Sequence, residues 1–494
     1  MAKMPVEFGE WRPDVALLDT KFASEVENVF AGINSYLPFP SLQAFSTVTL
    51  PGEVCGMYAA RTLGGSWKIY AGTRTKLYTW TAAAWIDVSR TVGGDYNVPF
   101  DAMWVFEQSG TKLVAVNQND DVQVIDIEAG THFAALAGSP PRAGHVKQIG
   151  DFLFLSNLTT NNRTIQWSAI NDITGWTVGL NLSDMQEFPD CGPVQGIAGA
   201  EIGYVVQDRG IRTLQFLPGD TTFIFNFSRV LHDRGSISKY GFTSIGNVLY
   251  FVSEDGFYSI TGQQVMPIGT DKVNDWWLAN SNVDKRNVVQ AIAGVNKPLV
   301  VWAYHGSDAS QIYDKQIIFN WSNQRWSKSS LSAQAWALLA TPGLDLDTDG
   351  TEPGDALLDS TALPLDSFVY VGGRPLIGAI DPDGHLAALT GPNMPATLET
   401  PEVHLIPGSR AFVSDVYPLD DARDDATGTV AAATRERLQD APVWQPPVRI
   451  ETTGSAAAYS SSRLHRFRRY IPAATVWTHA QGVVAEVQQD GTVA

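Results

Sequence analysis

A short apolar run that ends in a polar or glycine turn recurs along the chain, and this repeat constrains the fold more than any other feature. Its seven copies are Ile69–Gly72, Val114–Asn117, Phe154–Asn157, Tyr204–Gln207, Tyr250–Ser253, Val300–Ala303 and Val369–Gly372. Their starts lie 45, 40, 50, 46, 50 and 69 residues apart. A period of about 40 to 50 residues is typical of propellers whose repeat is a four-stranded blade. The repeat therefore predicts an all-β protein containing a β-propeller of about seven blades.

The residues that follow each run predict hairpins inside the repeat. Between Asn247 and Gly269, three apolar runs are separated by the turns Ser253-Glu-Asp-Gly and Thr261-Gly. Asn, Asp and Gly supply the backbone dihedral angles that tight turns require. We expect this stretch to form a meander of at least three strands. Two β-sandwiches with evenly spaced strands are the alternative fold.

The pattern changes towards both ends of the chain, which predicts three regions. Residues 1–45 include Pro13, Pro38 and Pro40 and no blade pattern, so an N-terminal arm or a propeller-closing segment is expected. Residues 46–395 carry the repeats, with an acidic insert near 343–359 that is expected to be a surface loop. Residues 396–494 contain alternating apolar and polar runs, which indicate an additional small C-terminal β domain.

The composition argues against several functional classes. The net charge of -18 argues against a general nucleic-acid binder, because such affinity comes largely from Lys and Arg. Two cysteines, Cys55 and Cys191, are too few for a disulfide framework, and we expect small core residues in a reducing compartment. No apolar run has the length of a signal peptide or of the ~20 residues that span a bilayer. A soluble protein made in the cytoplasm, without membrane insertion, is expected.

Motifs that would carry catalysis are not found in the sequence. It has no Gly-rich phosphate loop, no nucleophile elbow and no paired histidines at metal-ligand spacing. We therefore expect no enzyme activity, no catalytic residues and no cofactor.

One acidic stretch is a weak candidate for a cation loop. Asp345, Asp347 and Asp349 match the start of a calcium-binding loop. Pro353 and Ala356 then occupy positions where that loop needs oxygen ligands. A solvated acidic loop is the alternative.

The only dense basic run is Arg463-Leu-His-Arg-Phe-Arg-Arg-Tyr470. On a strand, Arg466 and Arg468 would share one face. Because the rest of the chain is acidic, we interpret Arg463, Arg466, Arg468 and Arg469 as an intersubunit or interdomain ion-pair site, and a phosphate site is the weaker alternative.

The middle of the chain resembles a known family. The segments that carry the resemblance, in order, are Ile165–Trp176, Ser183–Asp190, Gly192–Glu201, Gln207–Ile211, Asp255–Tyr258 and Pro267–Gly269. Phe39–Leu42 and Thr475–Gly482 extend it towards both ends. These segments resemble the nozzle, or tail-hub, proteins of short-tailed bacteriophages, which include the packaged-DNA stabilisation proteins. The acidic insert and residues 420–460 match only loosely.

The resemblance implies a structural virion protein of the phage tail. Six copies would form a homo-hexameric nozzle below the portal-adaptor complex and would extend and gate the channel for DNA retention and ejection. The implied partners are the head-to-tail adaptor and tail fibre, spike or needle proteins, and genomic DNA would pass without specific binding. Two alternatives remain: a tail protein that binds a host-surface receptor or glycan, and a propeller glycoside hydrolase, which would need converging carboxylates.

Overall fold

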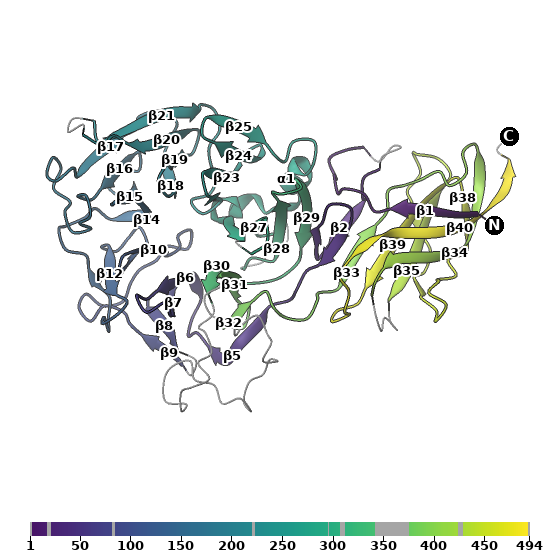
Figure 1. The fold of residues 1–494 in the computed structure, drawn as a ribbon, viewed down its shortest axis with the longest axis horizontal. Helices are drawn as coiled ribbons and strands as arrows, with labels where there is room; N and C mark the ends of the chain where they lie inside the picture. Colours follow the sequence, from purple (N-terminus) through teal and green to yellow (C-terminus); the bar gives the residue numbers. More distant parts are fainter. Residues whose placement is uncertain are drawn as a thin grey trace.

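The fold, given by a computed structural model, is almost entirely built from β-strands (Figure 1). The structure describes residues 2–16, 21–81, 84–219, 223–294, 296–306, 312–340, 375–422 and 428–492 of the 494. Its helices are α1 (Asn274–Asn280) and the 3-10 helix η1 (Val283–Val288). In this part of the chain, no helix has the length and apolar character needed to cross a membrane.

The described residues form seven four-stranded antiparallel sheets, which are the blades of a β-propeller. Six blades each use four consecutive strands. Their strands are β6 (Val54–Arg61), β7 (Trp67–Thr73), β8 (Leu77–Thr81) and β9 (Ala84–Asp87) in blade one; β10 (Val105–Ser109), β11 (Lys112–Val116), β12 (Gln123–Asp126) and β13 (Ala134–Ala135) in blade two; β14 (Ala143–Ile149), β15 (Phe152–Leu158), β16 (Thr164–Trp167) and β17 (Asp184–Glu187) in blade three; β18 (Val194–Gly199), β19 (Gly203–Gln207), β20 (Ile211–Phe216) and β21 (Phe225–Leu231) in blade four; β22 (Phe242–Ile245), β23 (Val248–Ser253), β24 (Gly256–Thr261) and β25 (Gln264–Pro267) in blade five; and β26 (Gln290–Gly294), β27 (Leu299–Tyr304), β28 (Lys315–Asn320) and β29 (Arg325–Ser329) in blade six.

The second strand of each blade explains the sequence repeat. Six of the seven repeats fall on β7, β11, β15, β19, β23 and β27. These strands are buried on both faces because neighbouring blades cover the two sides of each sheet, and all residues of β15, β19 and β27 are buried. The outermost strands β9, β17 and β25 are mostly exposed. The seventh repeat, Val369–Gly372, lies outside the described residues. The propeller prediction is confirmed.

The three runs between Asn247 and Gly269 form β23, β24 and β25, the expected meander. Ser253 pairs with Gly256 and Thr261 pairs with Gln264 across the two tight turns. Gly256 has a φ of +131°, and a Cβ there would lie 2.0 Å from Asn274 Cγ. Glycine is therefore required at this turn, because α1 packs its first residue directly against it.

Blade seven closes the ring with a strand from the start of the chain. It consists of β30 (Ala335–Ala340), β31 (Pro375–Ile380), β32 (His385–Ala388) and β5 (Gln43–Thr49). β5 is the outermost strand and pairs with β32, with Ala44 opposite Ala387 (Figure 1). The closing strand thus crosses the expected boundary at residue 45.

The remaining strands form two six-stranded sheets that pack face to face as a β-sandwich. One sheet contains β1 (Ala2–Glu7), β3 (Val29–Ala31), β4 (Tyr36–Pro38), β34 (Ser409–Asp420), β38 (Ser460–Ser462) and β40 (Ala480–Thr492). The other contains β2 (Glu25–Glu27), β33 (Ala396–Glu399), β35 (Thr429–Arg435), β36 (Val443–Trp444), β37 (Val448–Arg449) and β39 (Leu464–Ile471). The N-terminal strands β1 to β4 therefore belong to the same sheets as the C-terminal strands rather than to a free arm.

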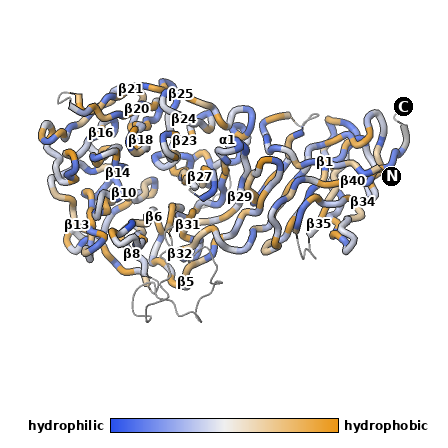
Figure 2. Tube along the Cα trace, viewed as in Figure 1, coloured by the Kyte–Doolittle hydropathy of each residue, from blue (hydrophilic) through white to orange (hydrophobic). Residues whose placement is uncertain are grey.

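The propeller and the sandwich share one apolar core. It joins Phe257, Trp302 and Trp326 of blades five and six to Val26 and Val413 of the sandwich. Figure 2 shows hydrophobic segments distributed through the strands of both modules. The shared core fixes the two modules to each other.

A buried arginine reinforces this junction. Arg325 on β29 donates to the backbone oxygens of Gly9, Gly32 and Ile33 at 2.6, 2.6 and 2.8 Å. Its guanidinium lies 5.0 Å from the Tyr36 ring. The N-terminal strands are thus clamped to blade six.

Candidate functional site

The basic run lies on β39, where alternate residues face opposite sides of the sheet. His465, Phe467 and Arg469 are at most 1% exposed and point into the sandwich. Arg466 and Arg468 lie on the other face, as the strand spacing predicts. The four arginines therefore do not form one continuous basic surface.

Arg466 and Arg468 belong to a cross-strand row of alternating charges. Arg468 Nη2 lies 2.6 Å from Glu399 Oε1, and Arg466 lies 3.6 Å from Glu399 and 3.8 Å from Glu402. Arg435 Nε lies 2.5 Å from Glu402 Oε1. Both glutamate side chains are at most 5% exposed. We call these five residues the charge ladder, which ties β33, β35 and β39 together.

A separate ion pair beside the charge ladder joins the sandwich to the propeller. Glu25 on β2 is in register with Glu399, and the ammonium of Lys328 on β29 pairs with Glu25. Burial raises the pKa of the Glu25 carboxyl above its ordinary value, and Glu399 adds to this effect, whereas Lys328 opposes it. The ion pairs of Arg466, Arg468 and Arg469 thus lie within the sandwich. The ion pair that crosses to the propeller is Glu25–Lys328. A contact with a second chain stays a prediction.

The other two arginines of the run have different surroundings. Arg469 bridges the two sheets, because its Nε lies 2.8 Å from Asp420 Oδ2 and the two side chains are 1% and 6% exposed. Arg463 precedes β39 and is half-buried. Among the described residues, no carboxylate lies within ion-pair distance of Arg463.

The candidate cation loop at Asp345, Asp347 and Asp349 lies outside the described residues. A different cluster, Asp381, Asp383 and His385, brings three ligand atoms within 4.8 Å of one another in the β31–β32 turn. Asp381 Oδ1 already accepts hydrogen bonds from the backbone N–H groups of Asp383 and His385. These hydrogen bonds stabilise the turn, and they account for the proximity of the three side chains without a metal ion.

The cysteines differ in their surroundings. Cys55 is buried at the start of β6, and burial raises the pKa of its thiol to about 12. Cys191 lies half-buried in a connecting loop with a φ of +60°. The expectation of a core residue is correct for Cys55 and wrong for Cys191, because the latter occupies a turn.

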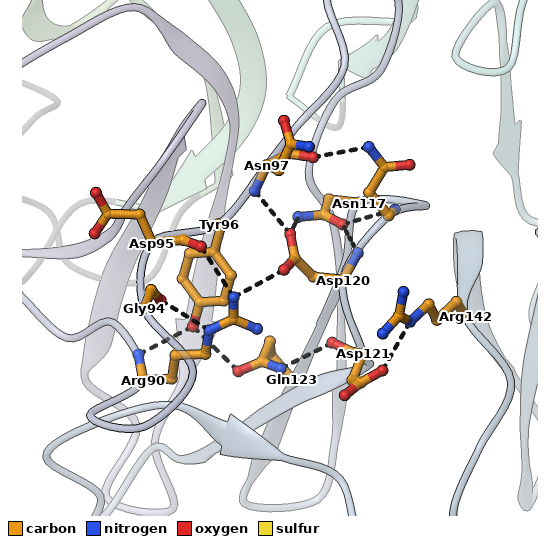
Figure 3. A network of polar contacts seen from close by, with 11 residues as sticks. Arg90, Gly94, Asp95, Tyr96, Asn97, Asn117, Asp120, Asp121, Gln123 and Arg142 are labelled. Atoms are coloured by element: carbon orange, nitrogen blue, oxygen red, sulfur yellow. Dashed lines mark hydrogen bonds and ion pairs between the residues drawn. The ribbon is translucent and has the colours of Figure 1, made fainter.

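A polar network that the sequence reading missed anchors the connection between blades one and two (Figure 3). Asp120 Oδ1 lies 2.9 Å from Arg90 Nη2, and Asp120 Oδ2 accepts from the Asn97 backbone N–H and from Asn117 Nδ2, each at 2.9 Å. The Arg90 guanidinium lies 4.4 Å from the Tyr96 ring. In the sequence, Asn117 and Asp120 stand three positions apart, and this spacing could have indicated the turn. Side chains of these two types form hydrogen bonds with the backbone of their own turn.

The axis of the propeller contains two cavities. The first, of about 240 Å³, is lined by residues of β6, β10, β14, β22, β26 and β30 and of the loop before β22. We call it the axial cavity. The second, of about 220 Å³, lies where these strands begin and includes Glu53, Arg74, Phe100 and Lys285. We call it the mouth cavity. Because the lining comes from strands far apart in sequence, no local motif marks either cavity.

A set of contacts at Met103 separates the two cavities, since Met103 lines both. Its backbone N–H donates to Tyr240 Oη at 2.7 Å, and its Sδ lies 3.6 Å from Tyr313 Oη. Tyr313 Oη in turn donates to the Val288 carbonyl at 2.7 Å. Burial raises the pKa of both tyrosines, so they remain neutral. These contacts span the propeller axis.

The axial cavity contains one ammonium group and aromatic walls. Lys239 Nζ donates to Gln118 Oε1 at 2.9 Å. Burial lowers the pKa of Lys239, and the nearby Asp101 carboxylate opposes this shift. His145 also lines the cavity, and burial lowers its pKa to about 3. Trp336 forms part of the wall from β30.

Comparisons with known proteins give no family. No family model matches the sequence, and no curated protein matches it. The solved structures that are similar include the computationally designed Ika8 protein, with a TM-score of 0.37 and 12% identity over 70% of this chain and 99% of that chain. BamB from Moraxella catarrhalis gives a TM-score of 0.33 and 12% identity over 73% of this chain and 94% of that chain. Likenesses at these scores carry no argument about function.

Proposed function

We propose that this protein is a structural component of a short-tailed bacteriophage tail, of the nozzle type. Six copies would form a ring below the portal-adaptor complex, and DNA would be held in and released through the channel between them. The sequence resemblance in the middle of the chain supports the proposal. Its segments are parts of blades three to five, for example β16, β18 and β24.

The structural observation that carries the proposal is the fixed junction between the propeller and the sandwich. The shared core, Arg325 and the Lys328–Glu25 ion pair all connect blade six to the sandwich module. Such a junction suits a protein that transmits force and keeps its neighbours in register. An enzyme lid or a flexible adhesin would require movement between modules.

The propeller axis does not serve as the DNA channel in this proposal. The contacts of Met103, Tyr240 and Tyr313 span it. The channel would therefore lie on the symmetry axis of the ring, between copies. With a net charge of -18 per chain, its wall would repel DNA and allow it to slide.

The hydrolase alternative receives little support from the cavities. Glycoside hydrolysis uses two carboxyl groups that flank the scissile bond. Among the described residues that line the mouth and axial cavities, Glu53 is the one carboxylate, and it pairs with Arg74 at 2.8 Å.

The test is the mass and symmetry of the purified protein, alone and with its adaptor, by light scattering and negative-stain imaging. A six-fold ring with an axial channel in either condition is expected. A monomer or trimer in both conditions would overturn the proposal, and glycan binding would become the next assay.

Substitutions in the basic run separate assembly from folding. Replacing Arg466 and Arg468 with Glu is expected to weaken the ring, but both residues also hold the charge ladder within one chain. Arg463→Glu leaves the ladder intact and is the cleaner test of a contact between copies. If Arg463→Glu assembles like the wild type, Arg463 is not part of the interface.

A further inference from the structure

The axial cavity has the features of a small-molecule site, and this inference does not depend on ring assembly. Its walls include Tyr58, Trp104, Tyr240 and Trp336 from four different blades or their connections. Sites for small ligands are concave, largely apolar and contain a few placed polar groups. A volume of about 240 Å³ accommodates a compact organic molecule.

The polar groups of the axial cavity include unused hydrogen-bond donors. Lys239 carries three N–H donors, and Gln118 Oε1 accepts one of them. The two remaining donors of Lys239 therefore favour an oxygen acceptor inside the cavity.

An anionic group of a ligand, placed at one end of the cavity, would be the most suitable hydrogen-bond acceptor for the Lys239 ammonium. Lys239 belongs to the loop before β22, so it lies at the end where the inner strands begin, together with Met103 before β10. Burial disfavours its ammonium, and a neighbouring anion would stabilise it. Asp101 supplies part of this charge without an ion-pair contact to Lys239.

Gln118, whose side chain accepts from Lys239, has an uncommon backbone conformation. Gln118 has a φ of +76° and Asn157, which accepts from Gln118 Nε2 at 3.4 Å, has a φ of +54°. Non-glycine residues rarely adopt these angles, and they concentrate at functional sites. The strained pair positions the oxygen that orients the ammonium.

We propose that the axial cavity binds a small molecule with an anionic oxygen head and a flat apolar body, of which an aryl carboxylate is the simplest form. The carboxylate would accept from Lys239 Nζ, and the apolar body would lie against the aromatic walls.

The probes are 2-naphthoate and its neutral counterpart 2-naphthalenemethanol, with binding to the full chain measured by calorimetry and by saturation-transfer NMR. We expect 2-naphthoate to bind with a dissociation constant of about 1 mM or below and at least about tenfold more tightly than the alcohol. No binding of 2-naphthoate to the wild type would overturn the proposal.

Two variants and one control locate the binding. Lys239→Met keeps the apolar stem and is expected to weaken 2-naphthoate binding at least about tenfold, with little change for the alcohol. Ala337→Leu adds volume to the cavity wall and is expected to abolish binding of both probes; it keeps the test usable if Lys239→Met fails to fold. Lys285→Met, in the mouth cavity, should change neither. Equal affinity of wild type and Lys239→Met for 2-naphthoate would overturn the anionic assignment, and unchanged binding in Ala337→Leu would overturn the location.

Discussion

At the scale of single residues, the pair Arg469–Asp420 is a deeply buried ion pair between the two sheets of the sandwich. Arg469→Met leaves the Asp420 carboxylate buried without its counter-charge, so we expect a loss of about 3 to 5 kcal/mol in the free energy of unfolding. Urea denaturation measures it. Arg437→Met, at an exposed position in the same module, is the control and should change stability by less than about 0.5 kcal/mol. Similar stabilities for the two variants would contradict the assignment.

His465 makes the stability depend on pH. Its side chain is fully buried, and burial lowers its pKa to about 4, although a hydrogen bond with the Ser460 backbone opposes this shift. The unfolded chain takes up this proton near pH 6.5, so the contribution is complete above pH 6.5 and is lost as the pH falls towards 4. About 2 kcal/mol should be lost by pH 5.

His465→Phe tests this pH dependence, because the aromatic ring is kept and the titrating group is removed. Unfolding by urea at pH 7.5 and pH 5.0 should show a difference about 2 kcal/mol smaller in the variant than in the wild type. His404→Phe, at an exposed position, should retain the wild-type difference. Equal pH dependence in His465→Phe and wild type would refute the role of His465.

At the scale of elements, β5 determines whether the propeller stays closed. Ala44→Pro removes a backbone N–H from the strand that joins blade seven to the N-terminal segment. Hydrogen exchange should show lost protection in β32 and in the neighbouring blade one. Ala84→Pro places the same change in β9, an outer strand that does not close the ring, and its effect should stay within blade one. Loss confined to β5 in Ala44→Pro would mean that closure does not depend on this strand.

Strand burial decides which elements could be predicted from the sequence. The second strands of the blades are continuous apolar runs because both faces are covered, and these runs gave the blade count. Outer strands such as β17 are polar and short, and they carry little signal. The pairing of β1 with β40 joins residues at opposite ends of the chain, and no local pattern specifies such a partner.

The candidate site was only partly predictable, for a related reason. The strand period placed Arg466 and Arg468 on one face correctly, but their partners Glu399 and Glu402 lie more than sixty residues earlier. The axial cavity combines six separate strands, and Lys239 is an ordinary lysine in sequence. These residues come together only when the seven blades close into a ring, so no local sequence pattern indicates them.

At the scale of the whole molecule, the clamp at Arg325 should make the two modules unfold together. Calorimetry of the wild type is expected to give one transition whose calorimetric and van't Hoff enthalpies agree. Arg325→Met removes three hydrogen bonds to the N-terminal segment, and we expect two separated transitions. Arg163→Met, which removes an exposed contact to the Pro189 carbonyl, should keep one. A single unchanged transition in Arg325→Met would show that the shared core alone couples the modules.

Strands from the start of the chain pair with strands that are synthesised last. This order affects how the chain folds during translation. β5 cannot meet β32 until residue 388 has left the ribosome, and β1 cannot pair until β40 is made. At about 5 to 20 residues per second, the first strands wait roughly 20 to 80 s for the propeller partner alone. During that interval their edges are open to other nascent chains. The cell must therefore protect the beginning of this polypeptide until its end arrives.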